Sequence, residues 1–543
     1  MRWLGSVAIG RLPDLRRLPR PGNVDRARLV SVERRLPLVE LMASMSLATD
    51  LGTGQPMEHG LRTCVLADRA GEQLGLDAEA RGCLRSTALL RFLGCTADAS
   101  ETAAVVGDEI GFNAAMAQVV MADNREALPR VLTRVGQGTP ALRRVSRVAA
   151  VLSDPGGKAR SLSAHCEVGA RLGTRIGVPA EVVHSLRHAY ERWDGKGLPT
   201  GLAGDDVPIA IRIAVVARDV DLFASAEGWD RTVVMLEHRS GRAYDPKVAA
   251  AFLSEGARWF GELASLDPWH EVTSADASDA VEVDAERLDQ VLAAFADFAD
   301  LKSPWFVGHS RAVAALAEAA AFASGLDRAQ ATQVRLTALV HDLGTVGISD
   351  AVWDRPGPLT VEGTERARLH PYLTERILGR CSALAPLACD AGAHHERLDG
   401  SGYYRATKEP SAAAQLVAAA DMYIALLENR PHRPAETPGA AADALAAEAD
   451  GGRLARVAVD AVLAATDNDA PTPNLRRPAE LTEREVDVLR LIARGQTNKQ
   501  TAAALGISAK TVGTHVEHIY AKAGVATRAG ATLFAMENDL LRA

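Results

Sequence analysis

One set of spacings occurs in both halves of this chain, and it constrains the fold more than any other feature. A spacing of 32 residues separates His59 from Arg91 in the first half and His309 from His341 in the second. A spacing of 26 residues separates His165 from Glu191 and His370 from Glu396. The segment ERWDGKGLP, which begins at Glu191, also aligns with ERLDGSGYY, which begins at Glu396. A frame repeated in this way indicates one structural unit used twice. We therefore predict two tandem domains of the same fold.

The first copy contains an insertion. About 45 more residues separate Cys95 from His165 than separate the matching positions of the second copy. We expect these residues to form a feature that belongs to the first copy alone.

Composition and periodicity favour an all-α protein. The chain has 543 residues, 47% of them hydrophobic and 24% charged, which is ordinary for a globular protein. This length exceeds what one core supports. Apolar residues recur every three or four positions, and alternating β-branched runs are scarce. We predict helical domains with few strands.

Charge and cysteine content limit the location of the protein. The net charge is −8, which argues against a surface coated by nucleic acid but allows a local DNA-binding face. The six cysteines form no CxxC pair, so we expect reduced thiols in a cytoplasmic protein. No run of 18 apolar residues is present, and we expect no membrane span.

The second copy carries residue types that bind metals, and the first copy has lost most of them. The seven candidate ligands of the second copy are His309, His341, Asp342, His370, His394, His395 and Asp421. Their counterparts in the first copy are His59, Arg91, Phe92, His165, Ala189, Tyr190 and Arg218. We expect His341 and Asp342 to be neighbours on a buried helix. A carboxylate can bridge two cations while imidazoles cap each of them, so the mixed set suits a two-metal iron or manganese centre.

The simpler interpretation is that these histidines are core residues and that DGSG is only a tight turn. One His-Asp pair alone would favour that interpretation. Seven ligand types at regular positions favour a metal site.

The second copy resembles the HD-GYP branch of the HD phosphohydrolase superfamily. The matching segments are HDLGTVGISDAVWDRPGPLT, the HP pair at His370, HHERLDGSGYY and AAADMYIAL. The resemblance implies an all-α fold, a centre of two or three metals with Asp421 as a ligand, and hydrolysis of cyclic di-GMP. It also implies catalytic roles for His341 and Asp342.

Three positions depart from the family pattern. Thr345 replaces a lysine that holds substrate phosphate, Trp305 replaces a glutamate found in three-metal members, and Tyr404 replaces the proline of the GYP motif. These changes affect substrate choice more than metal binding.

The first copy resembles the same superfamily without its metal site. The positive charges of Arg91 and Arg218 would repel a metal. If the alignment is shifted by one residue, Asp219 matches Asp421 in place of Arg218, but this restores only one ligand. We expect a structural pseudo-repeat. The alternative is that the two arginines attract the phosphates of a nucleotide.

The C-terminal segment has the signals of a helix-turn-helix unit. Thr482 and Glu485 form a capping box before a first helix, Thr497 caps a second, and Ser508 caps a third that runs from Ala509 to Lys522. The third helix is the candidate for the major groove of DNA. A small helical bundle for protein contacts is the alternative.

This segment resembles the DNA-binding domain of the LuxR family through LTEREVDVLRLIARGQTNKQTAAALGISAKTVGTHVEHIYAKAGVATRAG. The resemblance implies DNA contacts from Lys499, Lys510, Thr511, Thr514, His515 and Lys522. Gly513 stands where a base-reading lysine is common. The resemblance also implies a homodimer that pairs through the last helix, Arg528 to Leu540.

We therefore predict two tandem HD-type domains followed by a four-helix LuxR-type domain. The predicted limits are a disordered basic arm 1–35, a degenerate HD-type domain 36–265, a metal-binding domain 285–466, a linker 467–479 and a DNA-binding domain 480–543.

Two functions follow from this organisation. In the first, which we favour, the chain is a transcriptional regulator whose second copy binds metal and senses or hydrolyses a cyclic nucleotide. In the second, it is a metal-dependent phosphodiesterase with an accessory DNA-binding domain. Thr345 separates them, since a sensor tolerates loss of the usual lysine better than an enzyme does.

Overall fold

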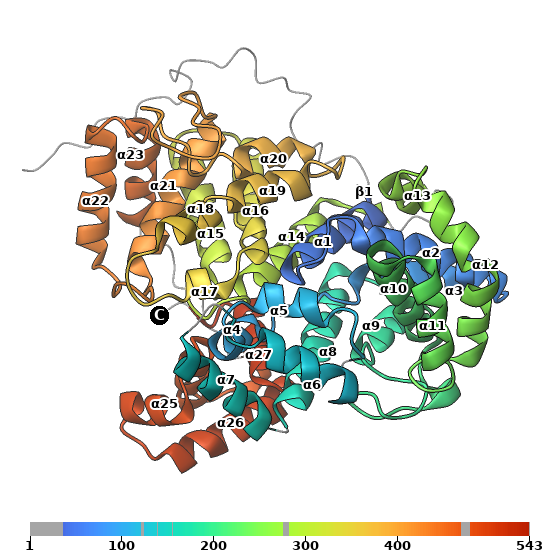
Figure 1. Cartoon of the computed structure of the whole chain (residues 1–543). Coiled ribbons are helices and arrows are strands. Elements are labelled where there is room, and N and C mark those ends of the chain that lie inside the picture. Colours follow the sequence, from blue (N-terminus) through green and yellow to red (C-terminus); the bar gives the residue numbers. More distant parts are fainter. Residues whose placement is uncertain are drawn as a thin grey trace, which may run out of the picture.

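A computed structural model describes residues 36–120, 124–137, 140–154, 156–274, 282–467 and 478–541 (Figure 1). In these ranges the fold is helical, and the strands are β1 (Leu36–Pro37) and β2 (Glu282–Val283), which pair antiparallel. The all-α prediction is confirmed. The predicted basic arm and most of the predicted linker lie outside the described residues.

The two copies form the two larger lobes in Figure 1. The first copy consists of α1 (Leu38–Gly52), α2 (His59–Gln73), α3 (Ala78–Leu90), α8 (Gly157–Ile176), α9 (Ala180–Arg187), η3 (Gly204–Asp206), α10 (Ile209–Glu227), α11 (Trp229–Arg239), α12 (Pro246–Leu263) and α13 (Pro268–Ser274). The second consists of α14 (Ala285–Asp300), α15 (His309–Ala323), α16 (Arg328–Val340), η4 (Leu343–Gly347), α17 (Asp350–Trp353), α18 (Val361–Ala367), α19 (His370–Leu378), α20 (Ala385–Ala391), α21 (Ala412–Leu427), α22 (Pro438–Asp450) and α23 (Arg456–Asp467).

The repeated frame has a structural counterpart in the helix starts. Helices α2 and α15 begin at His59 and His309, and α3 and α16 are each capped by an aspartate side chain, Asp77 and Asp327. An aspartate side chain at the first position before a helix satisfies a backbone N–H that has no partner within the helix. Equivalent capping signals therefore place equivalent helices in both copies.

A close backbone contact is also shared by the two copies. A Cβ atom on Gly94 would lie 2.0 Å from the carbonyl oxygen of His165, and one on Gly344 would lie 2.1 Å from that of His370. Only glycine permits this approach, which brings the loop after α3 or α16 against the helix that carries the next histidine.

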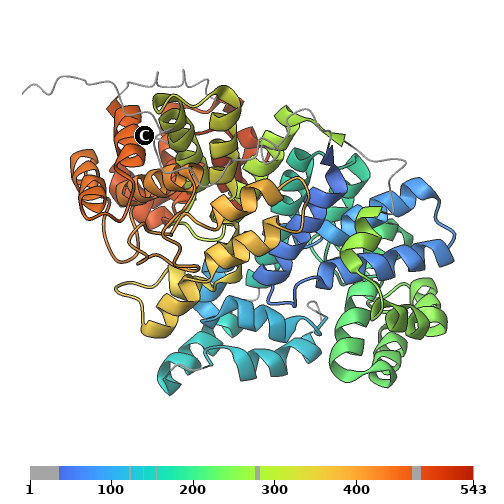
Figure 2. The same cartoon turned by 90° about the horizontal axis from the view of Figure 1, so that it is seen from above.

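The predicted insertion forms α4 (Ala99–Val106), α5 (Glu109–Met116), α6 (Asn124–Arg134) and α7 (Ala141–Ser153). Figure 2 shows these cyan-to-teal helices side by side at the lower centre of the view, next to the green helices of the first copy. The insertion contacts the second copy through α4 and α17.

A buried ion pair joins the insertion to the second copy. The Glu109 carboxylate on α5 accepts a 2.9 Å bond from Nζ of Lys302 and a 2.7 Å bond from the Ser349 hydroxyl. It also accepts a 2.9 Å bond from the backbone N–H of Asp350. The side chains of Glu109 and Lys302 are each 1% exposed.

The C-terminal domain has the four predicted helices, α24 (Glu483–Ala493), α25 (Asn498–Leu505), α26 (Ala509–Ala523) and α27 (Arg528–Glu537), preceded by η5 (Pro478–Glu480). The predicted capping box of Thr482 and Glu485 is present, and Thr497 and Ser508 cap α25 and α26 as predicted. Helix α27 packs against α8 of the first copy and α14 of the second, so this domain contacts both copies. The domain limits given above remain predictions.

Removal of the Glu109 carboxylate tests the joint between the insertion and the second copy. We expect Glu109→Ala to lower the free energy of unfolding by about 3 kcal/mol, because the buried Lys302 ammonium loses its hydrogen-bonded partner and keeps Asp350, 3.8 Å away, as an ion-pair partner. Urea denaturation measures this change. The double variant Glu109→Leu with Lys302→Met should recover most of the loss, and equal losses in both variants would contradict an electrostatic role.

Candidate metal centre

The His341-Asp342 pair lies at the end of a helix and not within it, which corrects the expectation from the sequence. Helix α16 ends at Val340, His341 is its C-terminal cap, and Asp342 precedes η4. The apolar residues before the pair bury the helix, but the close approach of Gly344 to α19 turns the chain directly after it. The Asp342 side chain lies beside His370 of α19, and the His341 ring lies beside the rings of His309 and His394.

Three of the histidines are oriented by the same local contact. Nδ1 of His341, His370 and His394 donates a 2.6 Å hydrogen bond to the backbone carbonyl three residues earlier, on Ala338, Ala367 and Ala391. A proton held on Nδ1 leaves Nε2 of a neutral imidazole free to bind a metal.

The free nitrogens converge on the Asp342 carboxylate. Its Oδ1 lies 3.4 Å from Nε2 of His370 and 3.5 Å from Nε2 of His394, while its Oδ2 lies 3.6 Å from Nε2 of His341. The two oxygens of one carboxylate thus face different imidazoles. This is the arrangement in which a carboxylate bridges two cations.

His309 and Asp421 extend the site on the His341 side. Nε2 of His309 lies 3.1 Å from Asp421 Oδ1, which is 3.9 Å from Nε2 of His341. Nδ1 of His309 lies 2.9 Å from Glu428 Oε2. Although burial opposes it, the charge of Glu428 and the bond to Asp421 hold the pKa of His309 well above its usual value.

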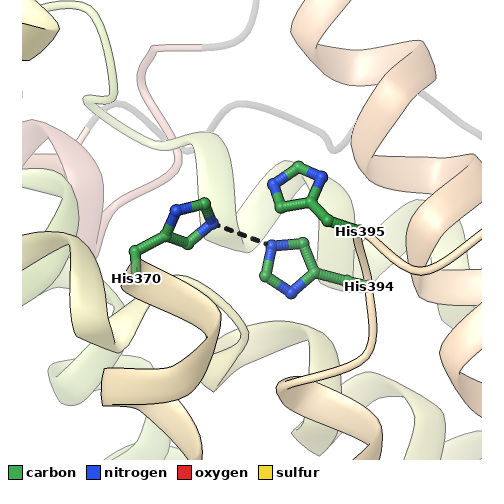
Figure 3. A group of neighbouring side chains, drawn as sticks. All are labelled: His370, His394 and His395. Carbon is green, nitrogen blue, oxygen red and sulfur yellow. Dashed lines mark hydrogen bonds between the residues drawn. The ribbon is translucent and has the colours of Figure 1, made fainter. Parts of the chain in front are cut away.

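His395 completes the other side of the site (Figure 3). His370 comes from the start of α19, and His394 and His395 follow α20, with 3.2 Å between the Nε2 atoms of His370 and His394. The His395 ring stacks on Tyr403 at 4.7 Å, and Trp353 packs edge-on to His370. These rings fix the outer wall of the site.

Electrostatics keep His370, His394, His395 and Asp342 in the protonation states that metals need. Burial, together with the charge of His341, lowers the pKa of His394 to about 3, and burial also lowers the pKa of His370 and His395. Burial opposes ionisation of Asp342, but the charge of His341 holds its pKa below the usual value. Neutral imidazoles beside ionised carboxylates are the metal-binding forms.

The seven residues therefore suit a pair of divalent cations. They form three overlapping groups whose ligand atoms lie within 4.8 Å of one another: His309, His341 and Asp421; His341, Asp342 and His394; and His370, His394 and His395. Nε2 of His341 is buried without a hydrogen-bond partner, and a bound cation would satisfy it. The choice of iron or manganese remains a prediction.

The three departures from the family pattern have structural consequences. Thr345 is buried, and its hydroxyl donates to the carbonyl of Asp342, so its side chain stabilises the turn. The Trp305 carbonyl accepts a bond from Arg430, which also pairs with Glu428. The Tyr404 hydroxyl lies 2.5 Å from a carboxylate oxygen of Glu375, away from the histidines.

Sequence spacing missed two residues near the site. Glu428 follows α21 and contacts His309, but no counterpart in the repeated frame marks it. Arg368 lies with its guanidinium 5.4 Å from the centre of the Tyr403 ring, which stacks on His395. The nearest sequence signal is the His370-Pro371 pair, two positions after Arg368, and it does not indicate a role for Arg368.

The first copy places different chemistry in the same position. His59 pairs with Asp221 at 2.7 Å, and His165 pairs with Asp98 at 2.6 Å. Asp219 does not restore a metal ligand, because Arg239 and Tyr244 bind the same carboxylate oxygen at 2.9 and 2.5 Å.

The predicted DNA-contacting residues are mostly on the surface of the C-terminal domain. Lys499, Lys510, Thr511 and Thr514 are exposed, and His515 is half-buried. Lys522 differs, because its Nζ donates 2.7 and 3.1 Å bonds to the Glu485 carboxylate and the Glu480 carbonyl. Lys522 therefore stabilises the start of α24.

The last helix, which was expected to form a dimer, is buried within the chain. The α27 residue Glu537 pairs with Arg171 of α8 at 2.7 Å, and Glu167 of α8 accepts a 2.7 Å bond from the N–H of Ala526. A Cβ atom on Gly308 would lie 3.4 Å from Leu541. The end of the chain therefore contacts the residue before the candidate ligand His309. The homodimer remains a prediction.

Two family profiles match the chain. The HD domain family matches residues 157–248 and 293–454, which lie in the first and second copies, and the luxR family of bacterial regulatory proteins matches residues 479–535. None of the helices in the described ranges is both long and apolar enough to span a membrane.

Individual proteins show the same division. The chain is 30% identical over 410 residues, 74% of its length, to the 3'3'-cGAMP-specific phosphodiesterase 3 of Vibrio cholerae, of which 89% is covered. The chain is also similar to a cyclic di-GMP phosphodiesterase of Thermotoga maritima, with 36% identity over 129 residues. This stretch covers 23% of the chain and 35% of that protein. The chain is 52% identical over 68 residues to the transcriptional regulatory protein YhcZ of Bacillus subtilis. This stretch covers 12% of the chain and 32% of that protein.

A solved structure extends the similarity to three dimensions. The crystal structure of a cyclic GMP-AMP-specific phosphodiesterase of V. cholerae superposes with a TM-score of 0.56 at 25% identity. The match covers 80% of this chain and 99% of that one. Both copies are therefore included in the shared fold.

Removal of the Glu428 carboxylate tests whether it positions His309. We expect Glu428→Gln to lower metal affinity about 10- to 100-fold, because partners of this kind orient a ligand and raise its basicity. Metal titration of the metal-free protein measures this affinity. Glu436→Gln, at an exposed position nearby, is the matched control. Equal affinities of the two variants would contradict the role of Glu428.

Proposed function

The chain belongs to the HD-GYP branch of the HD-domain family, and on that premise we propose that it is a DNA-binding regulator whose second copy hydrolyses a cyclic dinucleotide. The convergence of three imidazoles on the Asp342 carboxylate carries the proposal. In the first copy, cations and aromatic rings replace these ligands, so activity belongs to the second copy alone.

The second copy supplies orientation, and the metals supply the chemistry. The seven side chains would hold two divalent cations, which when bound would supply Lewis-acid stabilisation of a phosphoryl group and an activated water. Asp342 holds both positions in register because each of its oxygens faces a different set of imidazoles. The carbonyls of Ala338, Ala367 and Ala391 keep the imidazoles fixed.

A different cation takes the place of the missing lysine. Thr345 cannot contact phosphate from its buried position, whereas the Arg368 guanidinium lies over Tyr403, which stacks on the candidate ligand His395. We assign binding of a substrate phosphate to Arg368, since guanidinium groups bind phosphate through two parallel hydrogen bonds.

The C-terminal domain provides the output. Its candidate DNA-contacting residues Lys499, Lys510, Thr511 and Thr514 are exposed, while α27 is held against the two copies. The contact of Leu541 with Gly308 lies directly before His309. We propose that changes at the metal site alter this docking and thereby the DNA-binding activity.

Hydrolysis of cyclic dinucleotides by the metal-loaded protein tests the proposed enzyme. We expect the wild type to cleave 3'3'-cGAMP or cyclic di-GMP and Asp342→Ala to lose activity by at least about 1,000-fold, because the carboxylate on which three imidazoles converge is removed. Arg368→Met should raise KM without abolishing turnover. Arg366→Met, another exposed arginine at the end of α18, is its control.

Two outcomes would contradict the enzymatic proposal. If the metal-loaded wild type cleaves neither dinucleotide, the second copy is a sensor and not an enzyme. Cleavage that persists in Asp342→Ala would place the reaction elsewhere.

Two lysines of the C-terminal domain should behave differently in a DNA-binding assay. Lys499→Ala should weaken binding to a mixed-sequence duplex and reduce the slope of log affinity against log salt by about 1, because one phosphate contact is lost. Lys522→Ala should instead lower the melting temperature, since Lys522 pairs with Glu485. An unchanged salt slope in Lys499→Ala would remove this surface from the DNA interface.

A further inference from the structure

The first copy contains a cavity where the second copy has its metal ligands. Its volume is about 180 Å³. It is lined by the counterparts of five second-copy ligands, Arg91, Phe92, His165, Tyr190 and Arg218. The metal site has therefore been converted into a pocket of different chemistry.

Arg91 is a buried cation that lacks an anion. It is 8% exposed, and its Nε and Nη2 donate 3.1 and 2.9 Å bonds to the carbonyl of Ala189. Its Nη1 is buried without a hydrogen-bond partner, and no carboxylate in the described ranges forms an ion pair with it. A buried charge is costly without a partner, so a bound anion would stabilise this arrangement.

Arg218 and an aromatic ring complete the cationic wall. The guanidinium groups of Arg91 and Arg218 lie 4.9 and 5.7 Å from the centre of the Phe92 ring. Arg218 is only partly neutralised, because the carboxylate of Asp219 is shared with Arg239. One oxyanion near Phe92 could therefore meet both guanidinium groups.

The insertion closes the cavity on its apolar side. Phe112, Met116 and Val119 line it, and the carbonyl of Ala117 accepts a bond from Arg218. The second copy has no such insertion.

Asp98 and Glu191 also line the cavity, but Asp98 pairs with His165 and Glu191 accepts bonds from the N–H groups of Thr200 and Gly201. The two guanidinium groups and the apolar side chains therefore favour a molecule with one anionic group and one planar aromatic group.

We propose that the first copy binds a small phosphomonoester with a planar base, of the nucleoside monophosphate class, in this cavity. The volume of about 180 Å³ lies below the ~300–1,000 Å³ of common ligand pockets, so a mononucleotide suits it better than a cyclic dinucleotide. The phosphate pairs with Arg91 and Arg218, and the base lies among the apolar side chains of the insertion.

The insertion also connects this pocket with the second copy. Helix α5 contributes Phe112 to the cavity and Glu109 to the buried pair with Lys302. A ligand that fixes α5 also fixes the contact next to α17, whose Trp353 packs on His370.

Titration calorimetry with guanosine and adenosine 5'-monophosphate tests the pocket. The full chain is used in EDTA, so that binding at the metal centre does not contribute. We expect one nucleotide to bind the wild type, and Arg91→Met to weaken it about 10- to 100-fold through loss of a charged hydrogen-bond partner. Arg258→Met, an exposed arginine on α12, is the matched control and should leave the affinity unchanged.

A second variant guards against misfolding of Arg91→Met. Asn113→Trp fills the cavity from α5 while both arginines remain, and it should also abolish binding. The proposal is overturned if neither nucleotide binds the wild type at millimolar concentration. It is equally overturned if binding survives in both Arg91→Met and Asn113→Trp.

Discussion

The Asp342 carboxylate is the contact on which the second copy depends. Its two oxygens face imidazoles that come from the residue after α16, the start of α19 and the segment after α20, so three parts of the chain meet at one acidic group. Each imidazole is fixed by its own backbone carbonyl. The cluster is therefore organised by local bonds, and the charge of Asp342 offsets the repulsion that several buried imidazoles would create when protonated.

The two copies retain the same scaffold and differ in what it holds. Asp50 and Asp300 each accept the backbone N–H of the residue after His59 or His309, and both carboxyl groups are buried. Burial raises the pKa of Asp300 to about 8 and also raises that of Asp50. The first copy has Arg91 and Phe92 at the positions where the second copy has His341 and Asp342, yet both copies keep the buried aspartates Asp50 and Asp300. One fold therefore carries two different sites.

Much of this organisation could be predicted from the sequence because it depends on spacing and caps. The repeated frame predicted equivalent helices, and Thr482, Thr497 and Ser508 predicted the starts of α24, α25 and α26. Spacing also indicated the seven side chains that the structure brings together.

Contacts between distant segments could not be predicted in this way. Glu428 has no counterpart in the frame, and the pair of Lys522 with Glu485 depends on how α26 crosses α24. The burial of α27 against α8 depends on the packing of whole domains.

Anomalous X-ray diffraction from crystals loaded with manganese or iron tests the central claim most directly, since it locates metals without reference to activity. The account predicts two peaks, one on each side of the Asp342 carboxylate, and no peak in the cavity between Arg91 and Arg218. A single peak remote from Asp342, or a metal in the cavity of the first copy, would contradict it.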